Sequence, residues 1–159
     1  DWWTGKVYEG TATVPAPLDT LPLFLREGGT VPLLRPTIDA MAPTTRPDEV
    51  DSYATTPGVL WARISPSANP ASFSLFDGSK LEHQKQGAKF ILKSTDGSEF
   101  NFGVVFELVG TTKPSSVSEA GVAMAEVVDL EKAEKGWTFI DGTLRVKVAA
   151  GAHTIEVSP

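Results

Sequence analysis

The chain has 159 residues, enough to bury the core of one β-domain or of two small ones. It carries 14 Lys and Arg against 20 Asp and Glu, a formal charge of −6 with no basic cluster, which argues against a nucleic-acid partner. It has no cysteine, so disulfides and thiolate metal sites are excluded, and no apolar run approaches the roughly 20 residues of a membrane span. None of this assigns a compartment.

Short runs of Val, Phe, Leu, Ile and Thr, bounded by Gly, Pro, Asp and Asn, recur along the chain and predict an all-β fold of antiparallel β-sandwiches. The first strands are expected around residues 2–3, at 6–8 and at 11–14, with turns at 4–5 and 9–10. The sequence opens with Asp1-Trp2-Trp3 and has no initiator Met or leader-like segment. We therefore expect it to be an internal part of a longer protein.

The next two runs, Leu21–Leu25 and Thr30–Leu34, are almost entirely apolar and flank Gly28-Gly29. Strands that are apolar on both faces must be covered on both faces, and this chain offers little material for that. We expect these strands to pack against a further domain, and the isolated chain to self-associate through the surface left exposed.

Residues 35–57 contain four prolines and the acidic stretch Asp48-Glu49-Val50-Asp51, with little periodicity. A structureless segment of this length is unusual inside a compact domain, which favours a connection between two units. We therefore predict a proximal sandwich portion with its linker at 1–57 and a distal sandwich domain at 58–159.

The distal unit is predicted as a meander, with Asp77-Gly78, Asp96-Gly97 and Asp141-Gly142 as tight hairpin turns whose carboxylates serve the backbone. A single helical turn is conceivable at Leu130–Lys135. The expected strands are 59–65, 72–76, 79–83, 88–93, 100–109, 116–117, 123–130, 136–140, 143–148 and 153–157.

Two stretches carry a resemblance to a known family. Residues 1–10 read DWWTGKVYEG and residues 14–33 read VPAPLDTLPLFLREGGTVPL. This is similar to the stretch that follows the catalytic barrel in family 31 glycoside hydrolases, where a W-x-G hairpin leads into aPLD-x-iPlfvReGaiiPl. Residues 72–78, SFSLFDG, resemble the family's ft-L-Y-D-D-D-G but are shorter by two acidic residues.

The resemblance implies a proximal and a distal β-sandwich that follow a (β/α)8 barrel absent from this chain. In that family the barrel holds the two catalytic Asp residues of a retaining α-glycosidase, and the nucleophile motif W-x-D-M-N has no counterpart here. We therefore assign no catalytic, cofactor-binding or metal-binding residue. The chain is expected to lack activity of its own and to support the barrel of its parent enzyme.

Other constellations have simpler interpretations. His83 and His153 lie in different predicted strands and are expected on exposed strand faces. Oxygen ligands for Ca²⁺ could come from Asp39, Asp48, Glu49 and Asp51, but their spacing matches no known loop and favours a solvated acidic segment.

The four tryptophans leave two interpretations open. Trp61 and Trp137 alternate with polar neighbours, which favours core packing, whereas one of the adjacent Trp2 and Trp3 must face away from its own sheet. Exposed aromatic side chains could instead stack on sugar rings, which would make the chain a carbohydrate-binding module for oligosaccharides. The candidate contacts to the barrel or to a glycan are Trp2, Trp3, Phe24, Arg26 and Trp61.

Overall fold

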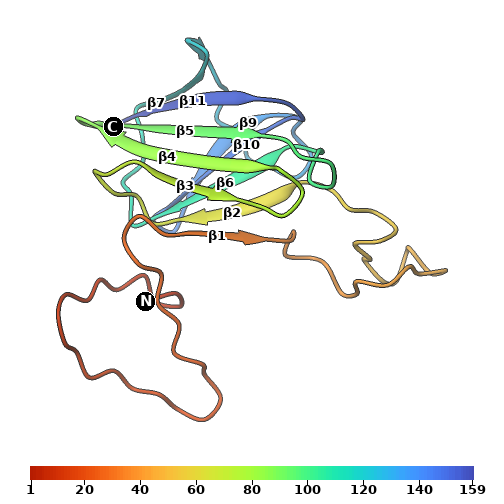
Figure 1. The fold of residues 1–159 in the computed structure, drawn as a ribbon, viewed down its shortest axis with the longest axis horizontal. Coiled ribbons are helices and arrows are strands. Elements are labelled where there is room, and N and C mark those ends of the chain that lie inside the picture. The colour runs from red at the N-terminus through yellow and green to blue at the C-terminus, as the bar shows by residue number, and fades with distance from the viewer.

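The computed structural model describes residues 1–159 and shows two packed β-sheets and no helix (Figure 1). The first sheet has the order β1 (Thr30–Leu33), β2 (Leu60–Ile64), β6 (Val104–Val109), β10 (Thr143–Val148) and β9 (Gly136–Ile140). The second has the order β3 (Ala71–Ser74), β4 (Lys80–Gln86), β5 (Lys89–Thr95), β11 (His153–Ser158), β7 (Ser116–Glu119) and β8 (Val122–Ala123). The all-β sandwich predicted from the sequence is confirmed.

The connectivity differs from the predicted meander. Neighbouring strands are consecutive in β3-β4-β5, but β6 crosses to the first sheet, where it pairs with β2 in parallel while every other pair is antiparallel. The Asp96-Gly97 turn therefore joins two sheets and is not a hairpin, and an Asp96 carboxylate oxygen accepts a hydrogen bond from the Gly151 N–H at 2.6 Å. No physical signal in a single strand specifies such a crossover.

The β9–β10 hairpin forms where its sequence predicts it. Asp141 and Gly142 have φ angles of 50° and 73°, as a two-residue turn with the twist of the flanking strands requires. In β10, Leu144, Val146 and Val148 are almost fully buried, while the alternate residues lie on the opposite face of the sheet.

Apolar side chains from both sheets form one core between them. Phe106 at its centre is fully buried, and Trp137 is buried with its Nε1 donating to the Met124 carbonyl at 3.1 Å. Core packing of Trp137 is thus confirmed. Trp61 is also buried, but it belongs to a smaller cluster with Val105 and Leu130 on the outer face of the first sheet.

Residues 1–29, here called the amino-terminal segment, contain no strand, so the strands predicted at 2–3, 6–8, 11–14 and 21–25 are wrong for this structure. The backbone N–H and C=O groups of a strand must hydrogen-bond to a neighbouring strand. In the first part of the chain only β1 finds such a neighbour, namely β2. The segment closes on itself through the Trp2 N–H and the Leu23 carbonyl at 2.9 Å, and projects from the sandwich (Figure 1). The division into two sandwiches stays a prediction.

Residues 34–59, the connecting arm, also contain no strand and project from the sandwich near β1 and β2 (Figure 1). Arg35 holds the two ends of the arm together. Its guanidinium pairs with the Asp51 carboxylate, with an Nε–Oδ2 distance of 2.9 Å, and its Nη1 donates to the Pro57 carbonyl at 2.8 Å. The hydrogen bond from Arg35 lowers the pKa of Asp51, and a second hydrogen bond, from the Thr37 hydroxyl, lowers it further.

One further prediction fails in the loop that precedes β9. Strand structure in the predicted strand 123–130 is limited to the end of β8. Residues 130–132 form a turn, and the Ala133 N–H donates to the Asp129 carbonyl at 3.3 Å, so no helix extends beyond this single turn. Backbone bonds explain the missing strand, because the Val127 N–H donates to the Trp137 carbonyl and the Trp137 N–H to the Ala125 carbonyl, at 2.8 and 3.0 Å. The loop therefore runs along the edge of β9 and carries Leu130 onto the outer face of the first sheet.

The two histidines also differ from the prediction of exposed positions. His83 on β4 is buried, and this burial lowers its pKa, against an opposing contact with the Gly28 backbone. His153 is partly buried and binds the Glu119 carboxylate, an interaction that lowers the pKa of Glu119. The partner of His83 lies in the amino-terminal segment and that of His153 on β7, and the spacing of two residues in the sequence indicates neither neighbour.

The carboxylate of Asp77, at the turn between β3 and β4, accepts hydrogen bonds from its own turn and from the loop between β5 and β6. Its carboxylate accepts hydrogen bonds from the Phe100 N–H at 2.9 Å, the Ser79 N–H at 3.0 Å, the Ser79 hydroxyl at 2.8 Å and the Glu99 N–H at 3.1 Å. Partial burial raises the pKa of Asp77, but these four bonds outweigh it and lower the value to about 2. A Cβ at Gly97 would collide with this carboxylate, so glycine is required there.

We expect Asp77→Asn to lower the free energy of unfolding by roughly 1–2 kcal/mol near neutral pH, discounted for solvent screening, because the amide cannot replace a charged fourfold acceptor. The folded-state pKa lies below the ordinary value, so this stability is present above a pH of about 4 and is lost as the pH falls toward about 2. Urea unfolding across that range should show the two proteins converging. Asp141→Asn is the control, since Asp141 precedes a glycine in the same way but its carboxylate has no hydrogen-bond partner.

No helix in the structure has the length and apolarity that crossing a bilayer requires.

Candidate functional site

The outer face of the first sheet carries a charged row across three strands. Glu107 on β6 lies directly beside Arg63 on β2 and Arg145 on β10. The Nε and Nη2 atoms of Arg145 both lie 3.0 Å from Glu107 Oε1, and the Nε of Arg63 lies 3.5 Å from Oε2. The Glu107 side chain is 10% exposed, so its charge is compensated mainly by the two guanidinium groups.

An aromatic ring lies against each arginine. The Trp2 ring centroid is 4.2 Å from the Arg63 Cζ, and the Trp61 centroid is 5.6 Å from the Arg145 Cζ. Both distances allow a cation–π attraction, stronger at the closer pair. We call these five residues, Trp2, Arg63, Glu107, Arg145 and Trp61, the outer-face ladder. Through Trp2, the ladder ties the amino-terminal segment to the sandwich.

A hollow of about 320 Å³ lies next to the ladder, between the connecting arm and the loop before β9. Its floor is formed by Trp61, Val105 and Lys147, which are cross-strand neighbours on β2, β6 and β10. The remaining lining residues come from the arm and the loop: Arg35, Thr37, Gly58, Val59, Leu130 and Glu131.

The residues predicted to contact a barrel or a glycan lie partly in the amino-terminal segment and partly on the first sheet. Trp2, Trp3 and Phe24 come together in the amino-terminal segment, where the Trp3 Nε1 donates to the Leu21 carbonyl at 2.7 Å. Arg26 is also in this segment, exposed and without an ion pair. Trp61 is buried on β2, two residues before Arg63, whose guanidinium lies against the Trp2 ring. Contact of any of them with a barrel or a glycan stays a prediction.

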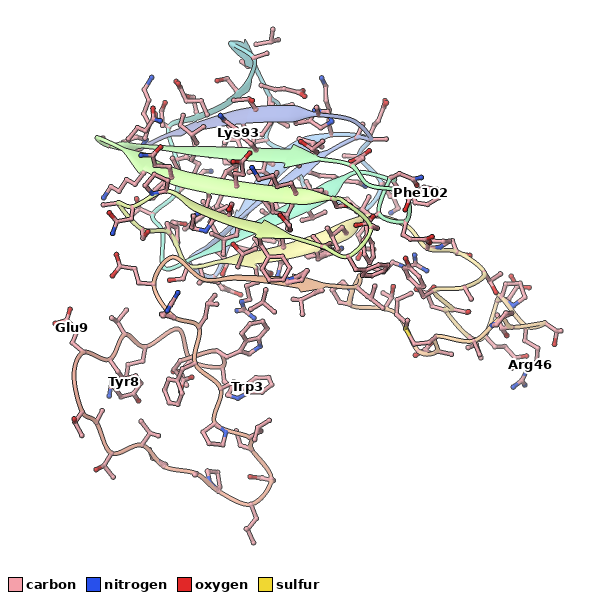
Figure 2. The ribbon with its side chains drawn as sticks, in the orientation of Figure 1. Trp3, Tyr8, Glu9, Arg46, Lys93 and Phe102 are labelled. Carbon is pink, nitrogen blue, oxygen red and sulfur yellow. The ribbon has the colours of Figure 1, made fainter.

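The amino-terminal segment exposes an unusual amount of apolar surface. Figure 2 shows Trp3 and Tyr8 on the part that projects from the sandwich. Six large apolar side chains are exposed there, by these fractions: Trp3 56%, Val7 78%, Leu18 111%, Leu21 67%, Leu23 37% and Phe24 52%. Six large apolar side chains exposed within 29 residues indicate a surface that another part of a protein covers.

Three of the four acidic residues of the connecting arm bind neighbours within the arm itself, and Asp48 does not. Asp51 pairs with Arg35 and accepts from the Thr37 hydroxyl at 2.5 Å, and Asp39 accepts from the Asp51 N–H at 3.0 Å. Glu49 pairs with Arg46 at 2.8 Å. No three carboxylate or imidazole groups of the chain come together as metal ligands would.

Sequence reasoning missed Arg63, Glu107 and Arg145. A signal was present in β6, where Glu107 is the one charged residue in Val104–Val109. A carboxylate inside an apolar strand needs compensation when it is buried, so a partner could have been anticipated. Its identity could not, because it depends on which strands flank β6.

Comparison with solved structures gives a fold relationship. The chain is similar to a Flavobacterium johnsoniae GH31 dextranase complexed with glucose, with a TM-score of 0.67, 14% sequence identity, and coverage of 93% of this chain and 21% of that chain. A mutant of the same dextranase complexed with isomaltotriose gives a TM-score of 0.66 and 13% identity, over 92% of this chain and 21% of that chain. No family model matches the chain, and no curated protein matches it.

The resemblance to family 31 glycoside hydrolases, stated above from two sequence stretches, is thus confirmed at the level of the fold. The chain spans about a fifth of the dextranase chains that it matches, and it contains no (β/α)8 barrel. In the dextranase the corresponding β region lies within a much longer chain, with other parts of the enzyme around it.

Proposed function

We propose that this chain is a non-catalytic β-sandwich region that supports the catalytic barrel of a retaining α-glycosidase similar to family 31. The observation that carries the proposal is the amino-terminal segment, whose apolar side chains are exposed although the sandwich beside it is well packed. Burial of such side chains stabilises by about 1.5–3 kcal/mol each, so a surface made of them has a strong tendency to be covered.

The position of the segment supports a barrel as the covering partner. The segment carries a sequence that resembles the stretch following the barrel in the family, and the dextranase with a region of this fold is a much longer glycoside hydrolase chain. The outer-face ladder fixes the segment to the sandwich through the contact between Trp2 and Arg63. A barrel that packs against the segment is therefore also held in place by the sandwich to which the segment is fixed.

Glycan binding at exposed aromatic side chains is the alternative function. Trp3 and Phe24 are exposed as it requires, but the ring beside Phe24 is Tyr8, at 5.8 Å and an interplanar angle of 82°. An edge-to-face pair does not offer the flat continuous surface on which sugar rings stack. The geometry therefore favours the supporting role for this surface.

The experiment begins with the source gene, read upstream of the codon for Asp1. An in-frame barrel would be produced separately and mixed with the chain, and its thermal unfolding measured with and without the chain. We expect the chain to raise the melting temperature of the barrel, and to show no turnover of an aryl α-glucoside by itself. Turnover by the chain alone, or a barrel indifferent to its presence, would refute the proposal.

A further inference from the structure

The second sheet ends at β3 in a strand edge whose backbone groups are free. The Leu75 N–H donates to the Ser79 carbonyl at 2.9 Å, and hydrogen-bonded pairs alternate along an antiparallel ladder, so the backbone groups of Phe73 also point toward β4. Those of Ser72 and Ser74 point the other way, where no strand pairs with β3. The N–H and C=O groups of these two exposed residues can therefore hydrogen-bond to a further strand.

The other three edge strands of the sandwich are protected against such pairing. In β1, the Gly29 carbonyl accepts from the Ser65 N–H at 3.0 Å, so Pro32 lies at an outward position, where it offers no N–H. The edge of β9 is covered by the loop at residues 125–127, and β8 is only two residues long. The strand β3 contains no proline and no charged residue, and its register with β4 is uninterrupted. It is the unprotected edge of the sandwich.

An apolar hollow of about 350 Å³ lies beside this edge, between β1 and β3, and is called the edge hollow. Pro32 contributes to it from the inner face of β1, in register with Ala62 of the core. Phe73 contributes from the inner face of β3, in register with Leu81 of the core. Seven of the nine lining residues are hydrophobic and none is charged, so the edge hollow fits apolar side chains.

The space beside β3 fits one added strand better than a second folded copy of the chain. Figure 1 shows that β1 extends beyond β3 at this side of the sandwich, so the first sheet reaches past the edge of the second. A strand added to β3 would lie over the inner face of β1. A second sandwich that paired through its own β3 would bring its own β1 to the same place, and the two first sheets would collide.

From this geometry we infer that β3 and the edge hollow bind an extended segment of another polypeptide. The segment adds a strand to the second sheet by pairing with the backbone of Ser72 and Ser74. Its alternate side chains point inward beside Phe73 and enter the edge hollow, so they are apolar, while those between them face solvent. The inference does not depend on the supporting role proposed above, which rests on the amino-terminal segment.

The test titrates the ¹⁵N-labelled chain with a short synthetic peptide in which leucine alternates with threonine, with a lysine at each end for solubility. We expect saturable shifts of the β3 amide signals, with a Kd on the order of 0.1–1 mM for so short a strand. At about ten times the Kd, hydrogen exchange of the Ser72 and Ser74 amides should slow about tenfold, because roughly one edge in eleven is then free.

A peptide in which serine replaces leucine is the control for the edge hollow. It can pair with the backbone of β3 but has no apolar side chain to place between β1 and β3. We expect it to bind at least about tenfold more weakly than the leucine peptide, because its side chains bury little apolar surface.

Two variants separate the strand edge from the edge hollow. Ser74→Pro removes an outward N–H that makes no bond to β4, so the sandwich should stay folded while binding weakens at least about tenfold. Phe76→Ala removes a wall of the edge hollow that is 86% exposed, and should weaken binding about fivefold or more. Phe102→Ala is the matched control, because Phe102 is 51% exposed but does not line the edge hollow.

Saturable binding that protects the Ser72 and Ser74 amides, and that is weakened by Phe76→Ala and kept in Phe102→Ala, would support the inference. It is overturned if the leucine peptide does not saturate, if these two amides stay unprotected, or if the two peptides or the two phenylalanine variants bind alike. Protection of the two amides that grows with the concentration of the chain alone would assign the edge to a second copy, and this result also overturns the inference.

Discussion

Replacing Glu107 with alanine is expected to lower the free energy of unfolding by about 3 kcal/mol, because two partly buried arginines lose their shared counterion. The side chains of Arg63 and Arg145 are 22% and 35% exposed, so water can replace part, but not all, of the lost interaction. Urea unfolding followed by tryptophan fluorescence measures the change. The Trp2 signal should respond as well, since Arg63 then no longer holds a fixed position beneath its ring.

Glu156→Ala is the control for this prediction. Glu156 is also a strand glutamate in an ion pair, with Lys89 at 2.5 Å, but these side chains are 41% and 50% exposed. Exposed pairs contribute roughly 0–1 kcal/mol, so the variant should remain close to the wild type. Equal effects of the two substitutions would mean that the outer-face ladder is an ordinary surface ion pair.

The parts of the fold that the sequence predicts are those determined within a few residues. The β9–β10 hairpin is one, because Asp141-Gly142 supplies the turn and Leu144 and Val146 alternate with polar residues around it. The expected strands at 59–65 and 153–157 correspond to β2 and β11 within one residue at each end. Turn chemistry and a period of two are local properties, so they are visible without the fold.

The outer-face ladder and the amino-terminal segment depend on distant parts of the chain. Arg63, Glu107 and Arg145 meet only because β6 lies between β2 and β10, and the parallel β2–β6 pairing sets their register. The segment around Leu21–Leu25 has the composition of a strand, yet it forms none without a strand to pair with. Local pattern thus predicts which residues can form strands, while the available partners decide which of them do.

The surface of the amino-terminal segment leads to the second large effect. Leu21→Lys combined with Phe24→Lys should weaken binding of the proposed barrel by roughly 10²–10⁴-fold, since two apolar contacts worth roughly 1.5–3 kcal/mol each are lost. These side chains are 67% and 52% exposed in the chain alone, so the stability of the sandwich should be almost unchanged. Calorimetric titration of the barrel measures the affinity, and light scattering should show less self-association of the isolated chain.

The matched control is Val122→Lys combined with Val128→Lys, which adds the same two charges to a chain of formal charge −6 at apolar positions that are at least as exposed, 70% and 100%. These residues lie in and after β8, away from the amino-terminal segment. If this control weakens the barrel complex as much as the first variant, the effect comes from net charge and not from the segment. If only the first variant does so, the affinity resides in the surface that carries Leu21 and Phe24, because the added charge and the number of substitutions are the same in both and the control positions are the more exposed.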